Sequence, residues 1–268
     1  MELLGLFLWV IIGMLFGLMG AGGSILTLPI LVYLFRIDVS TATTYSLFIV
    51  GSTSLLGALS YLKQGFFDKK AAIDFGIPSL ISVVITKIFI APLIPDTLFQ
   101  IGNMPFTKDT FLLCLLAIIM LTSSYRIITH HTKRGQETKN INVPNQNLLL
   151  TINGIIVGFL SAMIGVGGGF LIIPALIVLS KLDIKQAVGT SLAIIAIQSI
   201  VGFMSDYFSS HVDWSLIIPI TTVASIGVLL GSLLSKKVNA EKLKVALGWF
   251  IGLTAFCIIA EETILKIM

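Results

Sequence analysis

The chain has 268 residues, of which 56% are hydrophobic and only 11% are charged, and its mean hydropathy is +1.03. A soluble domain has about 25% charged residues, which argues against a soluble enzyme or a nucleic-acid-binding protein, and 17 Phe argue against a disordered chain. The formal charge of +4 is typical of a polytopic α-helical membrane protein that keeps Lys and Arg in its cytoplasmic loops.

Long apolar runs mark the predicted membrane segments. A transmembrane helix needs about 20 apolar residues, and such runs lie near 3–35, 40–61, 70–94, 110–129, 148–180, 186–207, 214–235 and 245–265. The polar stretch 130–147 separates them into two groups. We therefore expect a first transmembrane repeat at 1–129, a cytoplasmic linker at 130–147 and a second transmembrane repeat at 148–268.

Two of these runs are too long for one straight span. Runs 3–35 and 148–180 would each form a helix of roughly 50 Å, whereas the hydrocarbon core is about 30 Å thick. Glycines interrupt each run near its middle, at 20–24 and at 165–169, which we call the first and second glycine breaks. Because glycine permits backbone with positive φ and close approach, each run is predicted to be a helical hairpin with a glycine-rich turn.

The two halves repeat the same pattern. When the chain is shifted by 145 residues, so that Gly13 falls on Gly158, the halves align without a gap from about 11 to 98. Residues that coincide in the first half include Gly20, Gly22, Gly23, Pro29, Asp38, Ser46, Ser54, Gly57 and Asp68, which fall on Gly165, Gly167, Gly168, Pro174, Asp183, Ser191, Ser199, Gly202 and Asp213. Such matches indicate an internal duplication.

The loop charges indicate the relative orientation of the repeats. Lys and Arg are concentrated in the second and fourth loops of the first repeat, but in the first and third loops of the second repeat. Under the positive-inside rule the repeats would have opposite orientations. We therefore predict an all-α bundle of two inverted repeats, each a glycine-broken hairpin plus three spans, with both termini outside; eight plain spans are the alternative.

The glycine breaks are the first candidate for a binding site. A short helix is expected after each break, with Pro29 and Pro174 in its first turn, where the missing N–H is tolerated. The free N–H groups of that turn attract anions. The candidate residues are Gly22, Gly23, Ser24, Gly167, Gly168 and Gly169. The alternative is that these glycines only permit close helix packing.

Polar side chains within the spans supplement these candidates. They are Thr44, Ser46, Thr190, Ser191 and Gln198. Ser and Thr commonly bond to carbonyl groups of their own helix, so a structural role is the alternative for each hydroxyl. Lys87 lies within an apolar run and either contacts the substrate or extends to the membrane surface. Asp68 and Asp213 stand where helices should start and are predicted N-caps.

No signature of an enzyme is present. The sequence lacks GxxxxGK[ST], HExxH and GxSxG, and Cys114 and Cys257 have no metal-ligand spacing. We therefore expect no catalytic residue, no metal and no cofactor, and transport would depend on a gradient and not on ATP.

At these residues the sequence resembles the sulfite exporter TauE/SafE family of membrane permeases. The resemblance rests on GLMGAGGSILTLPIL at 17–31, GFLSAMIGVGGGFLIIPALIVL at 158–179, and the stretches ATTYSL at 42–47 and AVGTSL at 187–192. It implies a multi-pass transporter of the bacterial inner membrane that exports sulfite or moves small organosulfonates. The first repeat departs from the second by having Ser82 and Thr86 in place of Gly227 and Gly231, and by about ten extra residues near 101–110, which questions the close packing of its third span.

The predicted function is secondary transport of a small anion, sulfite or an organosulfonate, bound near the midplane between the repeats. An anion channel is the alternative, and an intramembrane enzyme or scaffold is a third. The expected partners are the anion, the lipid bilayer and a coupling ion such as the proton, without nucleic acid; the substrate, the direction of transport and a homo-oligomeric state stay open.

Overall fold

The computed structural model describes most of the chain. The described residues are 2–20, 24–95, 97–101, 104–129, 146–164, 169–180, 182–207, 212–235, 248–249, 252–253 and 255–260. The Gly22, Gly23, Gly167 and Gly168 candidates lie outside them, as does most of the predicted linker.

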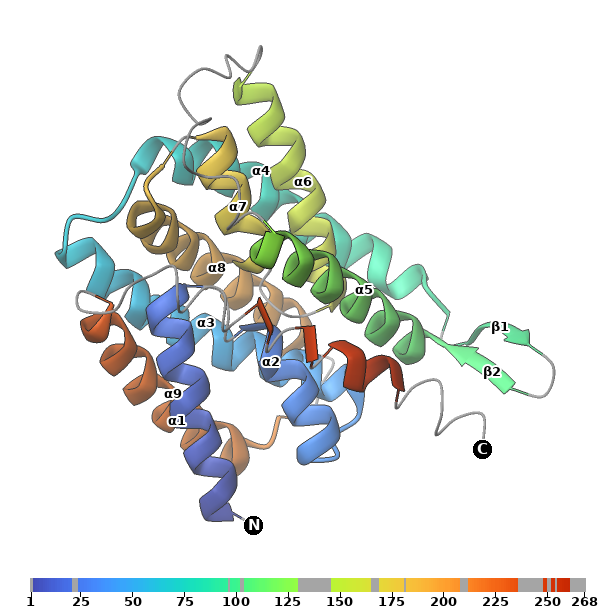
Figure 1. Cartoon of the computed structure of the whole chain (residues 1–268). Coiled ribbons are helices and arrows are strands. Elements are labelled where there is room, and N and C mark those ends of the chain that lie inside the picture. The colour runs from blue at the N-terminus through green and yellow to red at the C-terminus, as the bar shows by residue number, and fades with distance from the viewer. Residues whose placement is uncertain are drawn as a thin grey trace.

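Helices follow the predicted apolar runs closely (Figure 1). The first half contains α1 (Glu2–Met19), α2 (Ser24–Pro29), the π-helix η1 (Ile30–Leu34), α3 (Val39–Lys63), α4 (Lys69–Ile85), the π-helix η2 (Thr86–Ile90) and the 3₁₀ turn η3 (Ala91–Leu93). The second half contains α6 (Gln146–Ile164), α7 (Gly169–Leu179), α8 (Ile184–Tyr207) and α9 (Trp214–Leu234). Within the described residues, four helices are long and apolar enough to cross a membrane: α3, α4 with η2, α8 and α9.

The predicted helical architecture is confirmed, with one addition. A two-stranded antiparallel hairpin, β1 (Thr97–Ile101) and β2 (Met104–Thr107), precedes α5 (Lys108–Thr129). It projects away from the helices in Figure 1. The hairpin occupies the extra residues of the first repeat, where Phe and Thr favour a strand but the run is too short for a span.

Aspartates start the helices that follow the loops, as the sequence predicts. The carboxylate of Asp68 accepts a bond from Ala71 N–H at 2.7 Å, and that of Asp213 accepts one from Ser215 N–H at 3.0 Å. Asp38 caps α3 in the same way. The Ser215 hydroxyl also donates to Asp213, and together these bonds lower the pKa of this carboxyl below its ordinary value, because they favour its charged form.

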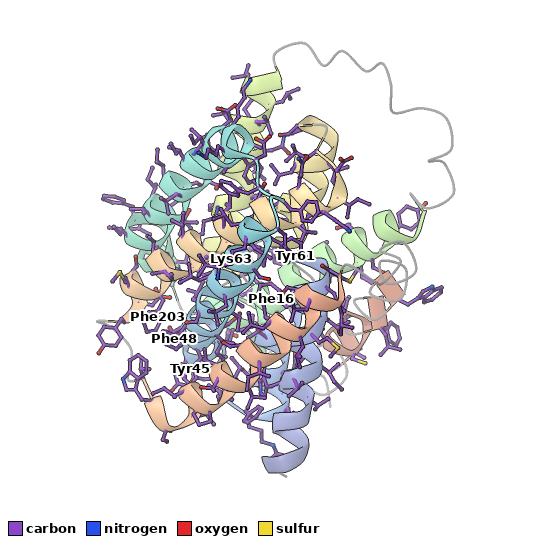
Figure 2. The ribbon with its side chains drawn as sticks, turned by 90° about the vertical axis from the view of Figure 1, so that its left-hand side faces the viewer. Phe16, Tyr45, Phe48, Tyr61, Lys63 and Phe203 are labelled. Atoms are coloured by element: carbon purple, nitrogen blue, oxygen red, sulfur yellow. The ribbon has the colours of Figure 1, made fainter. Side chains whose placement is uncertain are left out.

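Helices α3 and α8 pack antiparallel at the centre of the bundle. Gly51 lies against Ser199, and Gly57 lies against Leu192, so residue numbers fall along α8 as they rise along α3. Figure 2 shows the same arrangement at the ends of α3: Tyr45 and Phe48 lie at one end, near Phe203 of α8, and Tyr61 and Lys63 lie at the other. The rings of Phe48 and Phe203 are 5.1 Å apart.

The outer helices pack in two matching pairs, α1 with α9 and α4 with α6. A Cβ added to Gly13 of α1 would collide with the carbonyl oxygen of Ala224 in α9. A Cβ added to Gly158 of α6 would collide with the carbonyl oxygen of Ser79 in α4. Gly158 and Ser79 are the repeat equivalents of Gly13 and Ala224. The duplication in the sequence therefore recurs as matching contacts between helices.

Helices α1 and α3 run in the same direction. The hydroxyl of Tyr61, near the end of α3, donates to the carbonyl oxygen of Gly17, near the end of α1, at 3.0 Å. Towards the start of the same helices, Trp9 and Ile49 line one cavity. The chain must therefore return to its starting side between Met19 and Val39, and α2 and η1 are the helical parts of that return.

The two prolines do not lie where the sequence predicts. Helix α2 begins at Ser24 and α7 at Gly169, so Pro29 and Pro174 are the sixth residues of their helices and not part of the first turn. A proline at this position removes the bond from residue i to the carbonyl of residue i−4. After Pro29 the helix continues with the wider π-type turns of η1, which provide other partners for the carbonyl groups.

The doubt about the third span of the first repeat is also resolved. Where α9 has Gly227 close to Val10, α4 has Ser82, whose hydroxyl donates to the carbonyl oxygen of Ile155 at 2.7 Å. A hydrogen bond to the same backbone position therefore replaces the close glycine contact. Helix α4 packs on α6 as α9 packs on α1.

Candidate functional site

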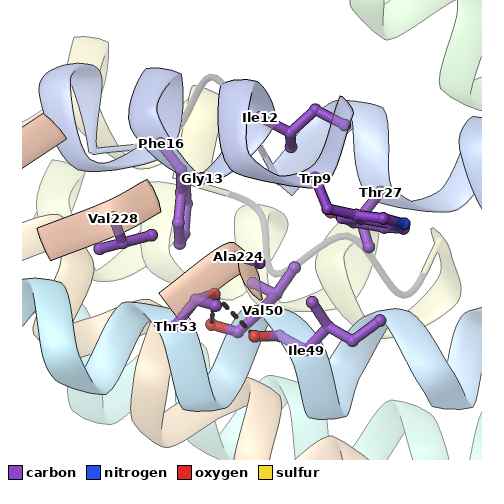
Figure 3. Close-up of a pocket in the computed structure, with 10 residues that line it drawn as sticks. All are labelled: Trp9, Ile12, Gly13, Phe16, Thr27, Ile49, Val50, Thr53, Ala224 and Val228. Carbon is purple, nitrogen blue, oxygen red and sulfur yellow. Dashed lines mark hydrogen bonds between the residues drawn. The ribbon is translucent and has the colours of Figure 1, made fainter. Parts of the chain in front are cut away.

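A small cavity lies between α1, α2, α3 and α9 (Figure 3). Its volume is about 10 Å³, which is enough for roughly one water molecule. In Figure 3 Trp9 and Thr27 lie at one end of the cavity and Phe16 and Val228 at the other. The remaining lining residues are Ile12, Gly13, Ile49, Val50, Thr53 and Ala224. The lining is mostly apolar. With this volume, the cavity is too small for a hydrated anion in this conformation.

Two polar groups lie at this cavity in different states. The hydroxyl of Thr53 donates to the carbonyl oxygens of Ile49 and Val50, at 2.6 and 3.2 Å. The indole nitrogen of Trp9 is buried and has no hydrogen-bond partner. A buried donor without a partner is unfavourable by about 1–3 kcal/mol. Trp9 is therefore the group at this place that would gain most from a polar ligand.

The equivalent place in the second half is filled by a side-chain pair. After the 145-residue shift, Thr53 and Ala224 correspond to Gln198 and Ser79. The side-chain amide of Gln198 donates to the hydroxyl of Ser79, and both side chains are buried. The other amide atom, Oε1 of Gln198, has no hydrogen-bond partner. The predicted candidate Gln198 therefore lies near the middle of the bundle and keeps one polar atom unpaired.

Unpaired hydroxyls gather where α3 and α8 cross. Ser54 of α3 and Ser199 of α8 are fully buried, and neither hydroxyl has a hydrogen-bond partner. These two serines correspond to each other in the repeats, and Ser199 lies against Gly51, about one turn before Ser54 on α3. Ser46, nearer the start of α3, is likewise buried and unpaired. Buried polar groups usually have partners, so these positions are the clearest candidates for contact with a polar ligand.

The structure separates the other predicted candidates into two levels. Thr44 and Ser46 lie near the start of α3, whereas Thr190 and Ser191 lie near the start of the antiparallel α8. At 1.5 Å per residue the two levels are roughly 18 Å apart along the helices. The predicted hydroxyls therefore do not form one cluster.

Three of these hydroxyls already have hydrogen-bond partners within the protein. The Thr190 hydroxyl accepts a bond from Asp68 N–H at 3.0 Å, and the Ser191 hydroxyl donates to the carbonyl oxygen of Val188 at 2.8 Å. Thr44 donates to the carbonyl of Ser40 at 3.4 Å. The Thr190 contact has its repeat equivalent in the bond from Asp213 N–H to the Tyr45 hydroxyl, at 2.9 Å. Thr190 and Tyr45 therefore join the halves at opposite ends of the bundle.

The short helices α2 and α7 are anchored in the hydrophobic core. Ser24 is the first residue of α2, and the buried Gly169 is the first residue of α7. Leu26 and Leu28 of α2 and Ile172 of α7 are fully buried in the two hydrophobic clusters. The backbone N–H groups at the start of α2 and α7 therefore belong to helices held firmly by the core.

Sequence reasoning missed one residue of this region. Asp206, near the end of α8, pairs with Lys87 of η2, with Nζ and Oδ2 2.5 Å apart. The Lys87 side chain is only 7% exposed, because it lies between the helices against Asp206. The signal was available, because Asp206 is the only carboxylate in the apolar run 186–207. Among the described residues no group of three or more His, Cys, Asp and Glu comes together to hold a metal.

Comparison with known proteins gives consistent matches. The model of the family described as sulfite exporter TauE/SafE matches residues 5–258. A probable membrane transporter protein of Methanocaldococcus jannaschii is 28% identical, over 90% of this chain and 89% of that protein. The probable membrane transporter proteins YunE and YjnA of Bacillus subtilis are 27% and 29% identical, over 87% and 90% of this chain and 89% and 92% of their own lengths. No solved structure matches the chain.

Proposed function

Because the chain belongs to the sulfite exporter TauE/SafE family, we propose that it is a secondary transporter that exports a small anion, sulfite or an organosulfonate. It is a multi-pass membrane protein, as its relatives and its candidate spans show. We place it in the inner membrane of a bacterium and assign it no catalytic residue or cofactor.

The repeats are proposed to be inverted in the membrane. Helices α3 and α8 occupy the same position in the two repeats, are both long enough to span, and run antiparallel. Two equivalent helices with opposite directions support opposite orientations of the halves. This agrees with the loop charges and with the parallel directions of α1 and α3.

The anion is proposed to bind near the midplane, where α3 and α8 cross. The observation that carries this proposal is the pair of fully buried, unpaired hydroxyls of Ser54 and Ser199. Sulfite and sulfonate oxygens accept hydrogen bonds from hydroxyl and backbone N–H groups. The first residues of α2 and α7, with Gly22, Gly23, Gly167 and Gly168 before them, would supply the backbone donors. Trp9 would supply its indole N–H, and Gln198 the second N–H of its side-chain amide.

The conformation described here is proposed to be a closed one. The cavity beside Trp9 holds about one water molecule, so the site must widen before an anion enters. A carrier that alternates between two openings meets this need, because one repeat can move against the other.

Transport by purified protein tests this function. In ATP-free proteoliposomes loaded with sulfite, sulfate, methanesulfonate or taurine, we expect saturable efflux of sulfite or a sulfonate down its gradient, because no nucleotide-binding motif is present. Saturable exchange indicates a carrier, and ion conductance without saturation indicates a channel. A strict requirement for ATP, or no flux of any of these anions, would contradict the proposal.

Tag accessibility tests the proposed orientation. In intact cells, epitope tags at the two termini should both react with a membrane-impermeant probe, because both termini are predicted to lie outside. A tag inserted in the linker 130–147 should react only after permeabilisation. A protected N-terminal tag beside an exposed C-terminal tag would contradict inverted repeats of this design.

A further inference from the structure

An ion pair lies within two candidate membrane spans. Lys87 belongs to the span formed by α4 and η2, and Asp206 belongs to α8. Their charged atoms are 2.5 Å apart, with side chains 7% and 22% exposed. It is the only salt bridge among the residues that the structure describes. Charged groups inside a membrane are costly to place there and usually serve a function.

The second half of the molecule shows that packing at this place does not require charge. The repeat equivalents of Lys87 and Asp206 are Ser232 and Tyr61. Ser232 and Ser60 hydroxyls lie 2.9 Å apart, and Tyr61 donates to the carbonyl of Gly17. Neutral hydroxyls therefore hold the equivalent contact at the opposite end. The charges of Lys87 and Asp206 need an explanation other than helix packing.

Among the described residues, the pair is isolated from other charges. The elements packed around η2 are α4, η3, α6 and α8, and α3 and α7 also pack on α8. Helices α6 and α7 and η3 carry no charged residue. Helix α3 carries Lys63 at its far end and Tyr45 near its start, whose hydroxyl accepts a bond from Asp213 N–H. The charges of α4 are Lys69, Lys70 and Asp74, and α8 carries Lys185; these lie at least three turns away along their helices. Tyr207 is the titratable neighbour on α8. Within the described residues, only Asp206 balances the Lys87 ammonium.

Because no other described charge balances Lys87, the Asp206 carboxylate and a bound anion would compete for the same ammonium group. A lysine ammonium with three donors binds sulfonate or sulfite oxygens by the same interaction with which it binds a carboxylate. Two negative groups cannot share one buried ammonium without strong repulsion. A protonated Asp206 carries no charge and can remain beside a bound anion.

We propose that Lys87 and Asp206 form a proton-linked anion-binding site at the outer end of the bundle. A proton taken up by the Asp206 carboxylate frees the Lys87 ammonium, which then binds an oxygen of the transported anion. When Asp206 loses that proton, its carboxylate reclaims Lys87 and displaces the anion. The only bond that forms and breaks is the O–H bond of the Asp206 carboxyl, and one proton from the solution binds for each anion. This proposal rests on the proposed transport function, and it adds a second binding site for the anion to the one at the midplane.

The surroundings agree with a position near the membrane boundary. The rings of Phe48, Phe203, Tyr207 and Trp214 form an aromatic cluster at this end of the bundle, with Phe48 and Trp214 5.3 Å apart. Aromatic residues concentrate where a membrane meets water. In the proposed orientation this end faces outside, since the Lys-rich loop after α3 lies at the other end. Protons and released anions would therefore exchange with the outer solution.

The test measures how outer pH changes the half-saturating concentration of labelled sulfite in proteoliposomes. At each pH the half-saturating concentration for the wild type is divided by that for Asp206→Asn. This ratio removes the titration of sulfite itself, which affects both proteins equally. We expect the apparent affinity of the wild type to rise as pH falls, by up to about tenfold per pH unit for one linked proton. Asp206→Asn should lack this dependence. If flux occurs only with methanesulfonate, the same ratio is measured with that anion.

Further variants separate this role from a structural one. Lys87→Gln should weaken sulfite affinity at least tenfold at the lowest pH measured, where Lys87 is free to bind the anion, and by less as the pH rises. The double variant Lys87→Gln/Asp206→Asn removes both charges. Its melting temperature should return towards that of the wild type from any loss seen in Lys87→Gln, whereas its sulfite affinity should stay as low as that of Lys87→Gln. Asp74→Asn, on the same helix, is the matched control and should keep the wild-type pH profile.

Each outcome decides one proposal. A constant ratio between wild type and Asp206→Asn across pH, or full recovery of affinity in the double variant, overturns the proton-linked site and leaves a structural ion pair. Flux that is saturable but independent of Lys87 leaves the transporter proposal standing alone. If the wild type moves no anion, the transporter proposal fails and this one fails with it.

Discussion

Gly158→Ala is expected to lower the melting temperature of the detergent-solubilised protein by about 10 °C, and Gly158→Leu should prevent recovery of folded protein. A Cβ at this position would collide with the backbone of Ser79, so α4 and α6 must separate along their contact. A backbone cannot move aside as a flexible side chain can, so a loss of about 3 kcal/mol is expected, at the upper end of overpacking effects. Thermal unfolding followed by size-exclusion chromatography measures it.

Gly76→Ala is the matched control on α4, at a position that faces α8. A Cβ at Gly76 would lie 3.4 Å from Cγ1 of Ile194, an ordinary contact. Alanine also favours a helix over glycine by up to about 1 kcal/mol. The melting temperature of Gly76→Ala should therefore equal or exceed that of the wild type. Equal melting temperatures for Gly158→Ala and the wild type would show that α4 and α6 do not approach so closely.

Gly23→Ala and Gly168→Ala are expected to weaken anion affinity roughly ten- to a hundredfold while the melting temperature barely changes. Both residues lie outside the described part of the chain, directly ahead of α2 and α7, whose first N–H groups are proposed to bind the anion. An added methyl group would keep an anionic oxygen from the backbone, and loss of one charge-assisted bond costs about 1.5–3 kcal/mol. Labelled-sulfite binding and thermal unfolding, measured on the same preparations, test this.

Gly65→Ala is the control for backbone strain at a glycine that lies outside the proposed anion-binding site. Gly65 has φ +78 in the turn after α3, and a Cβ there would meet no atom within 4 Å. Alanine at a positive φ is strained, so stability should fall by about 1 kcal/mol while affinity stays unchanged. If Gly23→Ala and Gly168→Ala lose only stability, as this control should, the glycine breaks are packing devices and leave the proposed site.

Helix positions and the duplication were predictable from the sequence because they depend on local and repeated patterns. Apolar runs of spanning length predict α3, α4, α8 and α9, and Asp68 and Asp213 predict helix starts through side-chain capping. The 145-residue repeat anticipates contacts as well, since Gly13 and Gly158 approach equivalent backbone positions in the opposite half. At these positions equivalent residues of the two halves make equivalent contacts.

Other features were decided only by tertiary structure. From the sequence, Pro29 and Pro174 could belong to the first turn of a helix. In the structure α2 and α7 begin five residues earlier, at Ser24 and Gly169, so neither proline does. The predicted hydroxyls also look equivalent in sequence. Antiparallel packing of α3 and α8 separates Ser46 from Ser191, and gives Ser191 a backbone partner while Ser46 has none. Which hydroxyl stays unpaired depends on neighbours distant in the sequence.

The sequence by itself determined the membrane class, the helical segments, the duplication and the family, because hydropathy and repeated glycine and proline positions are properties of the chain alone. Only the tertiary structure decided which polar groups meet. Lys87 and Asp206 are 119 residues apart, and each alone reads as a single charge near the end of an apolar run. They become a pair because α4 and α8 run parallel and bring their ends together, and burial between helices makes each charge depend on the other.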